Sequence, residues 1–178
     1  MVQRYLMRLI GGCVVVSLAL AADVSAGGST VVARVLSDEE AVELEIPTEI
    51  GVQKERLPLY RSGTVRYFSA GIGQVERAAH YPPFSLKLVF TAGGKPFVSG
   101  VTVTLRQKKG GTVVTVPQEH NTGPWLFIDL PDGIYGVSAT LGGVMQQVNE
   151  LKVRRGHVIT QHVRWAEDRS PALPAQAE

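Results

Sequence analysis

The sequence predicts an all-β protein whose second half forms a seven-stranded β-sandwich, preceded by a less regular N-terminal segment. Between residues 84 and 165, short runs rich in Val, Thr, Ile, Leu and aromatic residues are separated by Gly, Pro, Asn and Asp. Their spacing is typical of a sandwich, and no stretch of that region keeps a helical period. A length of 178 residues allows one core, with room for an appended segment.

The chain begins with the features of a secretory signal peptide. Arg4 and Arg8 supply positive charge, residues 9–22 form an apolar run, and small residues lead up to Ala26. A membrane-spanning helix needs about 20 apolar residues, and this run is shorter. We therefore expect residues 1–26 to be removed near Ala26 and the protein to be periplasmic or secreted, with no stable membrane insertion of the mature chain.

The only cysteine, Cys13, lies inside this apolar run. Residues 10–13 (IGGC) superficially match the pattern at which bacterial lipoproteins are cut and acylated. An apolar stretch of about 7 to 15 residues should precede such a cleavage site, whereas Cys13 follows Arg8 closely. We expect no lipid anchor on Cys13, and the mature chain then has no cysteine for a disulfide.

The N-terminal segment, residues 27–80, carries mixed signals. Residues 37–40 (SDEE) fit the start of a helix, yet residues 43–46 alternate as a strand does, and Pro47 should end either element. We expect a hairpin there. Residues 64–69 (TVRYFS) predict a further strand, and residues 74–79 a helical turn.

The sandwich itself is expected within residues 81–165. Val103 and Leu105 alternate with Thr102 and Thr104, which predicts that the first pair lies in the core and the second faces outward. Residues 166–178 are rich in Ala, Pro and acidic side chains and are predicted to be a disordered tail. The predicted strands are residues 85–91, 98–107, 112–117, 124–130, 134–141, 144–153 and 157–165.

One predicted strand is apolar on both faces. Leu126, Ile128 and Leu130 can fill the sandwich core, which leaves Trp125 and Phe127 on the opposite face. Two interpretations follow. Either the N-terminal segment covers these two rings, or they form a patch for a partner or ligand.

No motif predicts catalysis, a cofactor or a metal. The Gly71-Ile72-Gly73 stretch has Glu76 where a dinucleotide-binding loop needs a third small residue, and no βαβ unit surrounds it. His157 and His162 lie five residues apart in one predicted strand and so face opposite ways. The Gly-x-Ser-x-Gly motif of a hydrolase is missing. The chain is therefore not expected to be an enzyme.

The charge distribution gives one further candidate surface. Residues 81–165 contain 9 Lys and Arg against 4 Asp and Glu, a net charge of +5, which is too mild for a nucleic-acid binder. Lys152, Arg154 and Arg155 form the densest basic group. These residues belong either to a solvated loop or to a site for an anionic partner such as a polysaccharide or a phospholipid headgroup. With Trp125 and Phe127 they make up the candidate interaction patch.

A family resemblance adds to these observations. Residues 94–103 and the Leu-Pro-Asp-Gly-Ile-Tyr corner at residues 130–135 resemble the carboxypeptidase regulatory-like domain, which is related to transthyretin-like sandwiches. The resemblance covers residues 84–165 and implies a seven-stranded Ig-like or transthyretin-like β-sandwich. The chain also looks like small exported bacterial proteins in which residues such as 71–77 here precede one such domain.

The function expected from these features is non-catalytic binding in the periplasm. The partner would be another envelope protein or a glycan. A carbohydrate-binding module that uses Trp125 and Phe127 for stacking is the alternative. A small envelope hydrolase is a third and weaker reading, because it needs a nucleophile and a base close together.

Overall fold

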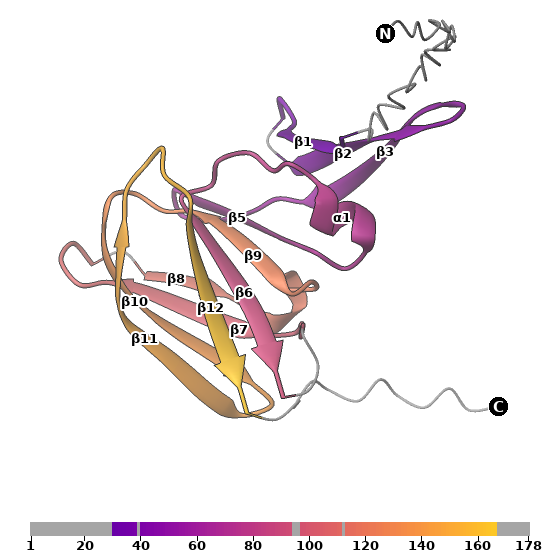
Figure 1. Cartoon of the computed structure of the whole chain (residues 1–178). Coiled ribbons are helices and arrows are strands. Elements are labelled where there is room, and N and C mark those ends of the chain that lie inside the picture. Colours follow the sequence, from indigo (N-terminus) through magenta and orange to yellow (C-terminus); the bar gives the residue numbers. More distant parts are fainter. Residues whose placement is uncertain (1–29, 39, 94–96, 112, 167–178) are drawn as a thin grey trace, which may run out of the picture.

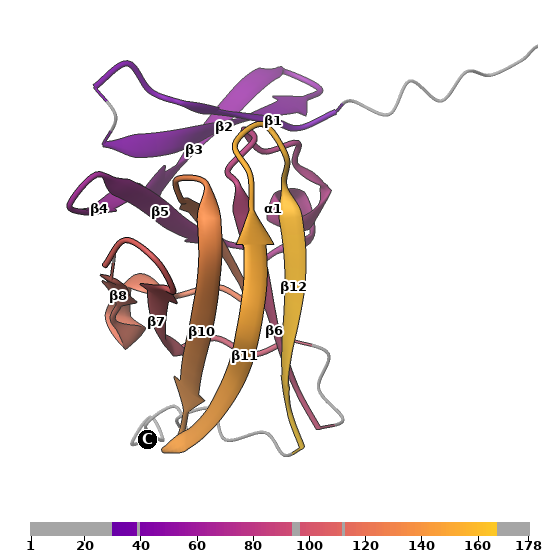
Figure 2. The same cartoon turned by 90° about the vertical axis from the view of Figure 1, so that its left-hand side faces the viewer.

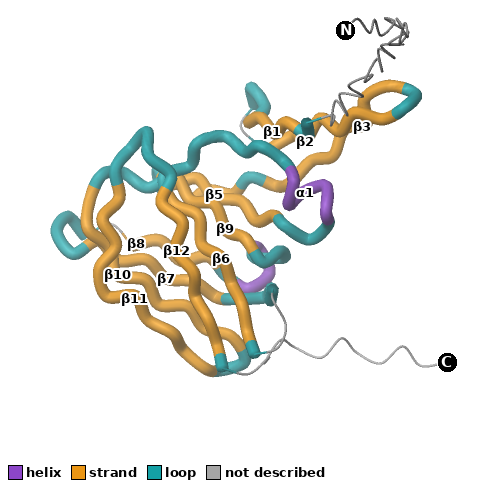
Figure 3. Tube along the Cα trace, viewed as in Figure 1, coloured by secondary structure: helices purple, strands orange, loops and turns teal. Residues whose placement is uncertain are grey.

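Figure 1 shows the computed structural model of the chain, which describes residues 30–38, 40–93, 97–111 and 113–166. These residues form twelve strands in three sheets, with one short helix, α1 (Gln74–Ala78), and one 3₁₀ turn (Gln118–His120) (Figure 3). The all-β prediction is confirmed. The predicted signal peptide, residues 1–26, and all of the predicted tail except Ala166 lie outside the described residues. In the parts that are described, no helix is long and apolar enough to cross a membrane.

Two of the sheets face each other as a sandwich (Figures 1 and 2). The four-stranded sheet has the order β11 (Val144–Val153), β10 (Gly133–Leu141), β7 (Thr102–Gln107) and β8 (Val113–Val116). The five-stranded sheet has the order β12 (Ile159–Trp165), β6 (Leu86–Ala92), β9 (Trp125–Asp129), β5 (Val65–Ala70) and β4 (Tyr60–Ser62). Neighbouring strands are antiparallel except β12 and β6, which run parallel.

The main core lies between these two sheets and follows the period-2 pattern of the sequence. Val103 and Leu105 on β7 are fully buried, as are Leu126 and Ile128 on β9, and all four belong to one hydrophobic cluster. Thr104, between the two buried β7 residues, is only partly buried. All seven strands predicted for residues 81–165 are present, with ends that differ by a few residues.

The two facing sheets contain nine strands rather than the expected seven, because the N-terminal segment contributes β4 and β5. Residue Phe68 of β5 lies directly opposite Phe127 of β9, and β4 continues the sheet beyond β5. The expected boundary at residue 80 would therefore cut through one continuous sheet. Strand β9 has a hydrogen-bonding edge on each side, and β6 pairs with one edge while β5 pairs with the other.

A third sheet covers the outer face of the five-stranded sheet (Figures 1 and 2). Its strands are β1 (Val32–Val35), β2 (Ala41–Thr48) and β3 (Gly51–Pro58), in that order. Its inner face forms a second hydrophobic cluster with side chains from β5 and β9. This second core contains Val31, Ala33, Val42, Leu44, Leu57, Leu59, Phe68, Ala70, Phe84 and Phe127. Strand β9 is thus buried on both faces, which explains its two-sided apolar sequence.

The expected hairpin in the N-terminal segment is present as β2 and β3, but Pro47 does not end the strand. Strand β2 continues through Pro47, which lies opposite Val52, to Thr48, which lies opposite Gly51. A two-residue turn makes the closing Thr48–Gly51 pair a hydrogen-bonded one, so the next pair is not hydrogen-bonded. The missing N–H of Pro47 therefore removes no bond to β3.

The outer face of the third sheet carries an ion network centred on Glu43 of β2. Lys54 Nζ lies 2.8 Å from Glu43 Oε1, and Arg56 Nε lies 3.5 Å from Oε2. Arg34 contacts both Glu43 and Glu45. The hydrogen bond from Lys54 holds the pKa of the Glu43 carboxyl below its ordinary value. The acidic strand β2 is therefore held between basic side chains from both of its neighbours.

Candidate functional site: an arginine-lined pocket

The structure places Phe127, one of the predicted patch residues, inside the second core. Its ring is 4% exposed. It stacks on Phe68 with centroids 4.7 Å apart and planes 3° from parallel. Phe127 therefore offers no surface to a partner, and the N-terminal segment covers it.

The second patch aromatic, Trp125, is half-buried and already has intramolecular partners. Lys87 Nζ lies 3.3 Å from its ring centroid, and partial burial lowers the pKa of the Lys87 ammonium. Gly71, at a φ of +97°, packs so closely that a Cβ there would lie 3.0 Å from the Trp125 ring. The Phe97 ring lies nearly perpendicular to the Trp125 ring, with centroids 6.5 Å apart. These contacts leave Trp125 poorly placed for stacking on a sugar.

The predicted basic group is divided by the fold. Lys152 lies opposite the exposed Ile134 on the outer face of the four-stranded sheet, between the buried residues Leu151 and Val153. Arg154 is exposed in the turn between β11 and β12. Arg155 lines a pocket that contains neither Lys152 nor Arg154.

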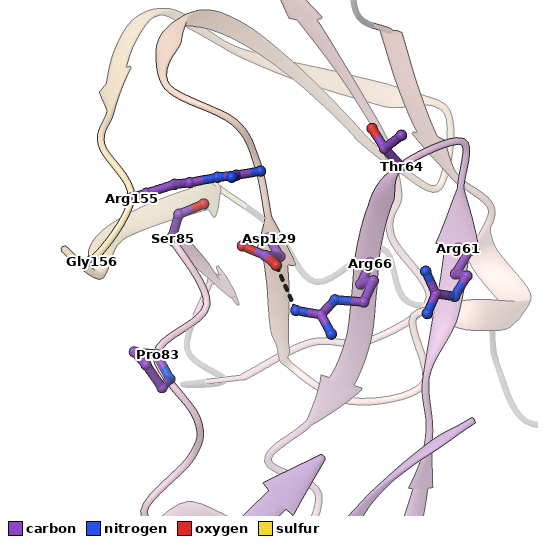
Figure 4. A pocket seen from close by; sticks show the side chains of 8 residues that line it. All are labelled: Arg61, Thr64, Arg66, Pro83, Ser85, Asp129, Arg155 and Gly156. Atoms are coloured by element: carbon purple, nitrogen blue, oxygen red, sulfur yellow. Dashed lines mark hydrogen bonds and ion pairs between the residues drawn. The ribbon is translucent and has the colours of Figure 1, made fainter. Parts of the chain in front are cut away.

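That pocket lies where strands of the five-stranded sheet meet the β11–β12 turn (Figure 4). It has a volume of about 500 Å³ and is lined by Arg61, Thr64, Arg66, Pro83, Ser85, Asp129, Arg155 and Gly156. We call it the arginine pocket. In Figure 4 the Arg61 and Arg66 side chains extend from neighbouring strands, and Arg155 extends toward the strand that carries Asp129.

Strand register fixes the central pair of the pocket. Arg66 on β5 lies directly opposite Asp129 at the end of β9, and Arg66 Nη2 donates to Asp129 Oδ2 at 2.8 Å. The Arg66 guanidinium also lies 5.8 Å from the centroid of the Phe84 ring. A carboxylate on one side and an aromatic face on another hold this guanidinium in a defined position.

Ser85 forms part of the pocket wall but its hydroxyl is used structurally. Ser85 Oγ accepts from the Leu130 N–H at 2.8 Å and contacts the carbonyl oxygens of Leu130 and Ile128 at 3.0 and 3.3 Å. The residue is 1% exposed. These bonds fix the end of β9, and so the position of Asp129, rather than presenting a nucleophile.

The corner at residues 130–135 holds the third arginine. Asp132 Oδ1 accepts the backbone N–H of Arg155 at 2.7 Å, which ties the β11–β12 turn to the corner. The corner is closed by Tyr135, whose hydroxyl donates to the Pro131 carbonyl oxygen at 2.9 Å. Gln107 Nε2 donates to the Asp132 carbonyl oxygen. The corner at residues 130–135 therefore positions the main chain of the pocket residue Arg155.

The sum of these charges is positive. The lining contains three arginines and one aspartate, a net charge of +2, and the aspartate is already paired with Arg66. Of the three arginines, the sequence reasoning identified Arg155 alone. Arg66 lies in the predicted strand of residues 64–69 and Arg61 lies before it, and no local pattern predicts that either residue is near Asp129.

The described residues contain no group of three or more His, Cys, Asp or Glu side chains that could hold a metal ion. His120 Nδ1 is hydrogen-bonded to the hydroxyl of Tyr67 at 3.0 Å, and its ring stacks on Tyr60 with centroids 3.7 Å apart. No protein-family model, no curated protein and no solved structure matches this chain.

Proposed function

We propose that this protein is a non-catalytic binding module that holds an anionic group of an envelope glycan in the arginine pocket. The observation that carries the proposal is the convergence of three arginines on one pocket, Arg61 and Arg66 from two neighbouring strands and Arg155 from the β11–β12 turn, with Asp129 as the one carboxylate in the lining. Guanidinium groups bind carboxylate and phosphate oxygens in a planar, two-point arrangement. A pocket with this lining attracts such a group and repels cations.

The way the arginines are held also supports binding rather than catalysis. Arg66 is braced by Asp129 and Phe84, and the main chain of Arg155 is tied to Asp132. Fixed positions reduce the entropy lost when a ligand binds. The hydroxyl of Ser85 is engaged with the main chain, so the pocket wall has a structural hydroxyl where a hydrolase needs a reactive one.

The proposed setting is the bacterial periplasm or the cell exterior. The sequence of residues 1–26 supports export. An envelope protein with an acidic segment is the alternative partner. We favour a glycan because the pocket is open to solvent, which suits the charged side group of a long polymer.

We also propose that residues 84–165 form a carboxypeptidase regulatory-like unit. Strands β6 to β12 would be its seven strands, three in one sheet and four in the other, as in Ig-like sandwiches. The bond from Tyr135 to Pro131 supports the resemblance, because it closes the corner on which the resemblance rests. The strands before β6 would then be an addition specific to this type of chain.

Binding of a polyanion tests the proposed function. Polygalacturonate, a polymer with carboxylates, is titrated into the protein, with neutral dextran as the ligand control. Arg155→Ala and Arg61→Ala are expected to weaken binding about three- to tenfold each, the range for charge-assisted hydrogen bonds at a partly exposed site. Arg154→Ala is the matched control, because it removes the same charge one residue away from the pocket lining.

The result that contradicts the proposal is equally specific. If Arg154→Ala weakens binding as much as Arg155→Ala does, the attraction comes from overall charge and not from the pocket. Equal binding of dextran and polygalacturonate would also exclude a role for the arginines.

A further inference from the structure

A second hollow lies beside α1 and shares no residue with the arginine pocket. It has a volume of about 320 Å³ and is lined by Gly71, Ile72, Arg77, Phe97, Val98, Ser99, Thr122 and Pro124. We call it the Ile72 hollow. Ile72 and Phe97 are 62% and 38% exposed, and both lie on the wall of the same hollow.

The Gly-x-Gly-x-x-Glu-Arg stretch builds one wall of this hollow. Glu76 Oε2 accepts the backbone N–H groups of Gly71 at 2.6 Å and Ile72 at 3.2 Å. The Glu76 side chain is thereby turned into the loop and is buried. The Ile72 side chain is exposed, and Glu76 is not among the residues that line the hollow.

Arg77 supplies the only charge among the lining residues. Its Nη1 donates to the carbonyl oxygens of Gly71 at 3.0 Å and Ile72 at 3.2 Å. Its guanidinium carbon lies 5.6 Å from the centroid of the Phe97 ring. The backbone and the aromatic ring together hold the cation beside an apolar surface, and a guanidinium has further N–H donors to offer.

From this arrangement we infer that the Ile72 hollow binds a carboxylate joined to an apolar group about the size of a leucine side chain. Arg77 pairs with the carboxylate, and the apolar group packs on Ile72, Phe97 and Pro124. The volume is at the lower end of the range for ligand sites, which favours a small group. The apolar wall displaces water from the ion pair and so strengthens it.

A ligand of this kind is either a free branched-chain acid or the C-terminal end of a peptide. NMR titration of the unmodified protein compares the two, with 4-methylpentanoate as the probe for a free acid and N-acetyl-leucine as the probe for a peptide end. Tighter binding of N-acetyl-leucine identifies a peptide end, because its acetyl amide corresponds to the peptide bond before a C-terminal residue. Equal or tighter binding of 4-methylpentanoate identifies a free acid.

The control ligands separate the two parts of the interaction. N-acetyl-leucine amide lacks the carboxylate, and acetate lacks the apolar group. Each is expected to bind at least about tenfold more weakly than N-acetyl-leucine. If the amide binds as well as the acid, or if no probe shifts the Ile72 and Phe97 resonances at about 10 mM, the inference is wrong.

Variants locate the site and distinguish it from the arginine pocket. Ile72→Asp places a negative charge on the wall while keeping the backbone groups that Glu76 and Arg77 bind, and it is expected to abolish binding of the probes. Val75→Asp is the matched control, because Val75 is 39% exposed on the same short segment but does not line the hollow. Equal losses in both variants would overturn the inference. Arg155→Ala should leave these probes unaffected, so this site can fail or succeed independently of polyanion binding.

Discussion

Replacement of Phe127 by alanine tests whether the three-stranded sheet is an integral part of the folded protein. The Phe127 ring centroid lies 4.7 Å from that of Phe68 and 4.7 Å from that of Tyr81. Both partners belong to or pack against the second core. Truncation removes these contacts and leaves a cavity between the third sheet and the sandwich.

The expected loss follows from the environment of the ring. Burial of a phenylalanine side chain contributes about 2 kcal/mol, and each of the two aromatic contacts adds about 1 kcal/mol. The sum, about 4 kcal/mol, lies within the usual range for a buried Phe changed to Ala. For a domain of this size it corresponds to a fall in Tm of about 10 °C.

The assay is equilibrium unfolding in urea, with the slope of the transition monitored to check that the unfolded state is unchanged. Phe97→Ala serves as the control, because that ring is 38% exposed and its loss should cost about 1 kcal/mol or less. A loss for Phe127→Ala as small as that of the control would refute the reasoning. It would mean that the third sheet is not held against β9 in solution.

Two further predictions concern polar side chains, Tyr135 and Glu43. Tyr135→Phe removes the only hydroxyl that closes the corner at Pro131, and we expect about 1 kcal/mol less stability in the same urea assay; an unchanged midpoint would show that the bond is not needed. Glu43 has a lowered pKa in the folded state. Its ionised carboxylate therefore stabilises the fold above the ordinary glutamate pKa of about 4.3. This stabilisation is lost as the pH falls through the lowered pKa of the folded state. Thermal unfolding of Glu43→Gln should therefore give a lower Tm than the parent at neutral pH and a similar Tm in acid, whereas a constant difference at all pH values would contradict the ion-pair role.

Local sequence patterns predicted the strands of residues 81–165 well, because the runs are rich in β-branched and aromatic residues, several alternate with a period of two, and Gly, Pro, Asn or Asp separate most of them. Val103 and Leu105 are buried as their alternation implied. The same reasoning failed at Pro47, where the residue occupies a position that needs no hydrogen bond. A single-residue rule cannot include the register of the partner strand, which decides whether the proline is tolerated.

The arginine pocket was only partly predictable for a related reason. Arg155 was identified because it stands in a dense basic group. Arg66 and Asp129 become a pair only through the alignment of β5 with β9, two segments far apart in the chain. Pairing between distant strands depends on tertiary packing and leaves no local signature. Conversely, Lys152 and Arg155 are close in sequence but lie on different parts of the surface.

The parallel pairing of β12 with β6 has a consequence for the order of folding. In the five-stranded sheet, β6 lies between β9 and β12, and β12 is the last described strand of the chain. One edge of β6 therefore stays open until the C-terminal strand has been made and has docked. Such distant pairings raise the contact order, so we expect slow folding, on a timescale of milliseconds to seconds. A ribosome-bound chain that lacks β12 would expose this edge, where a chaperone or a second chain could pair with it.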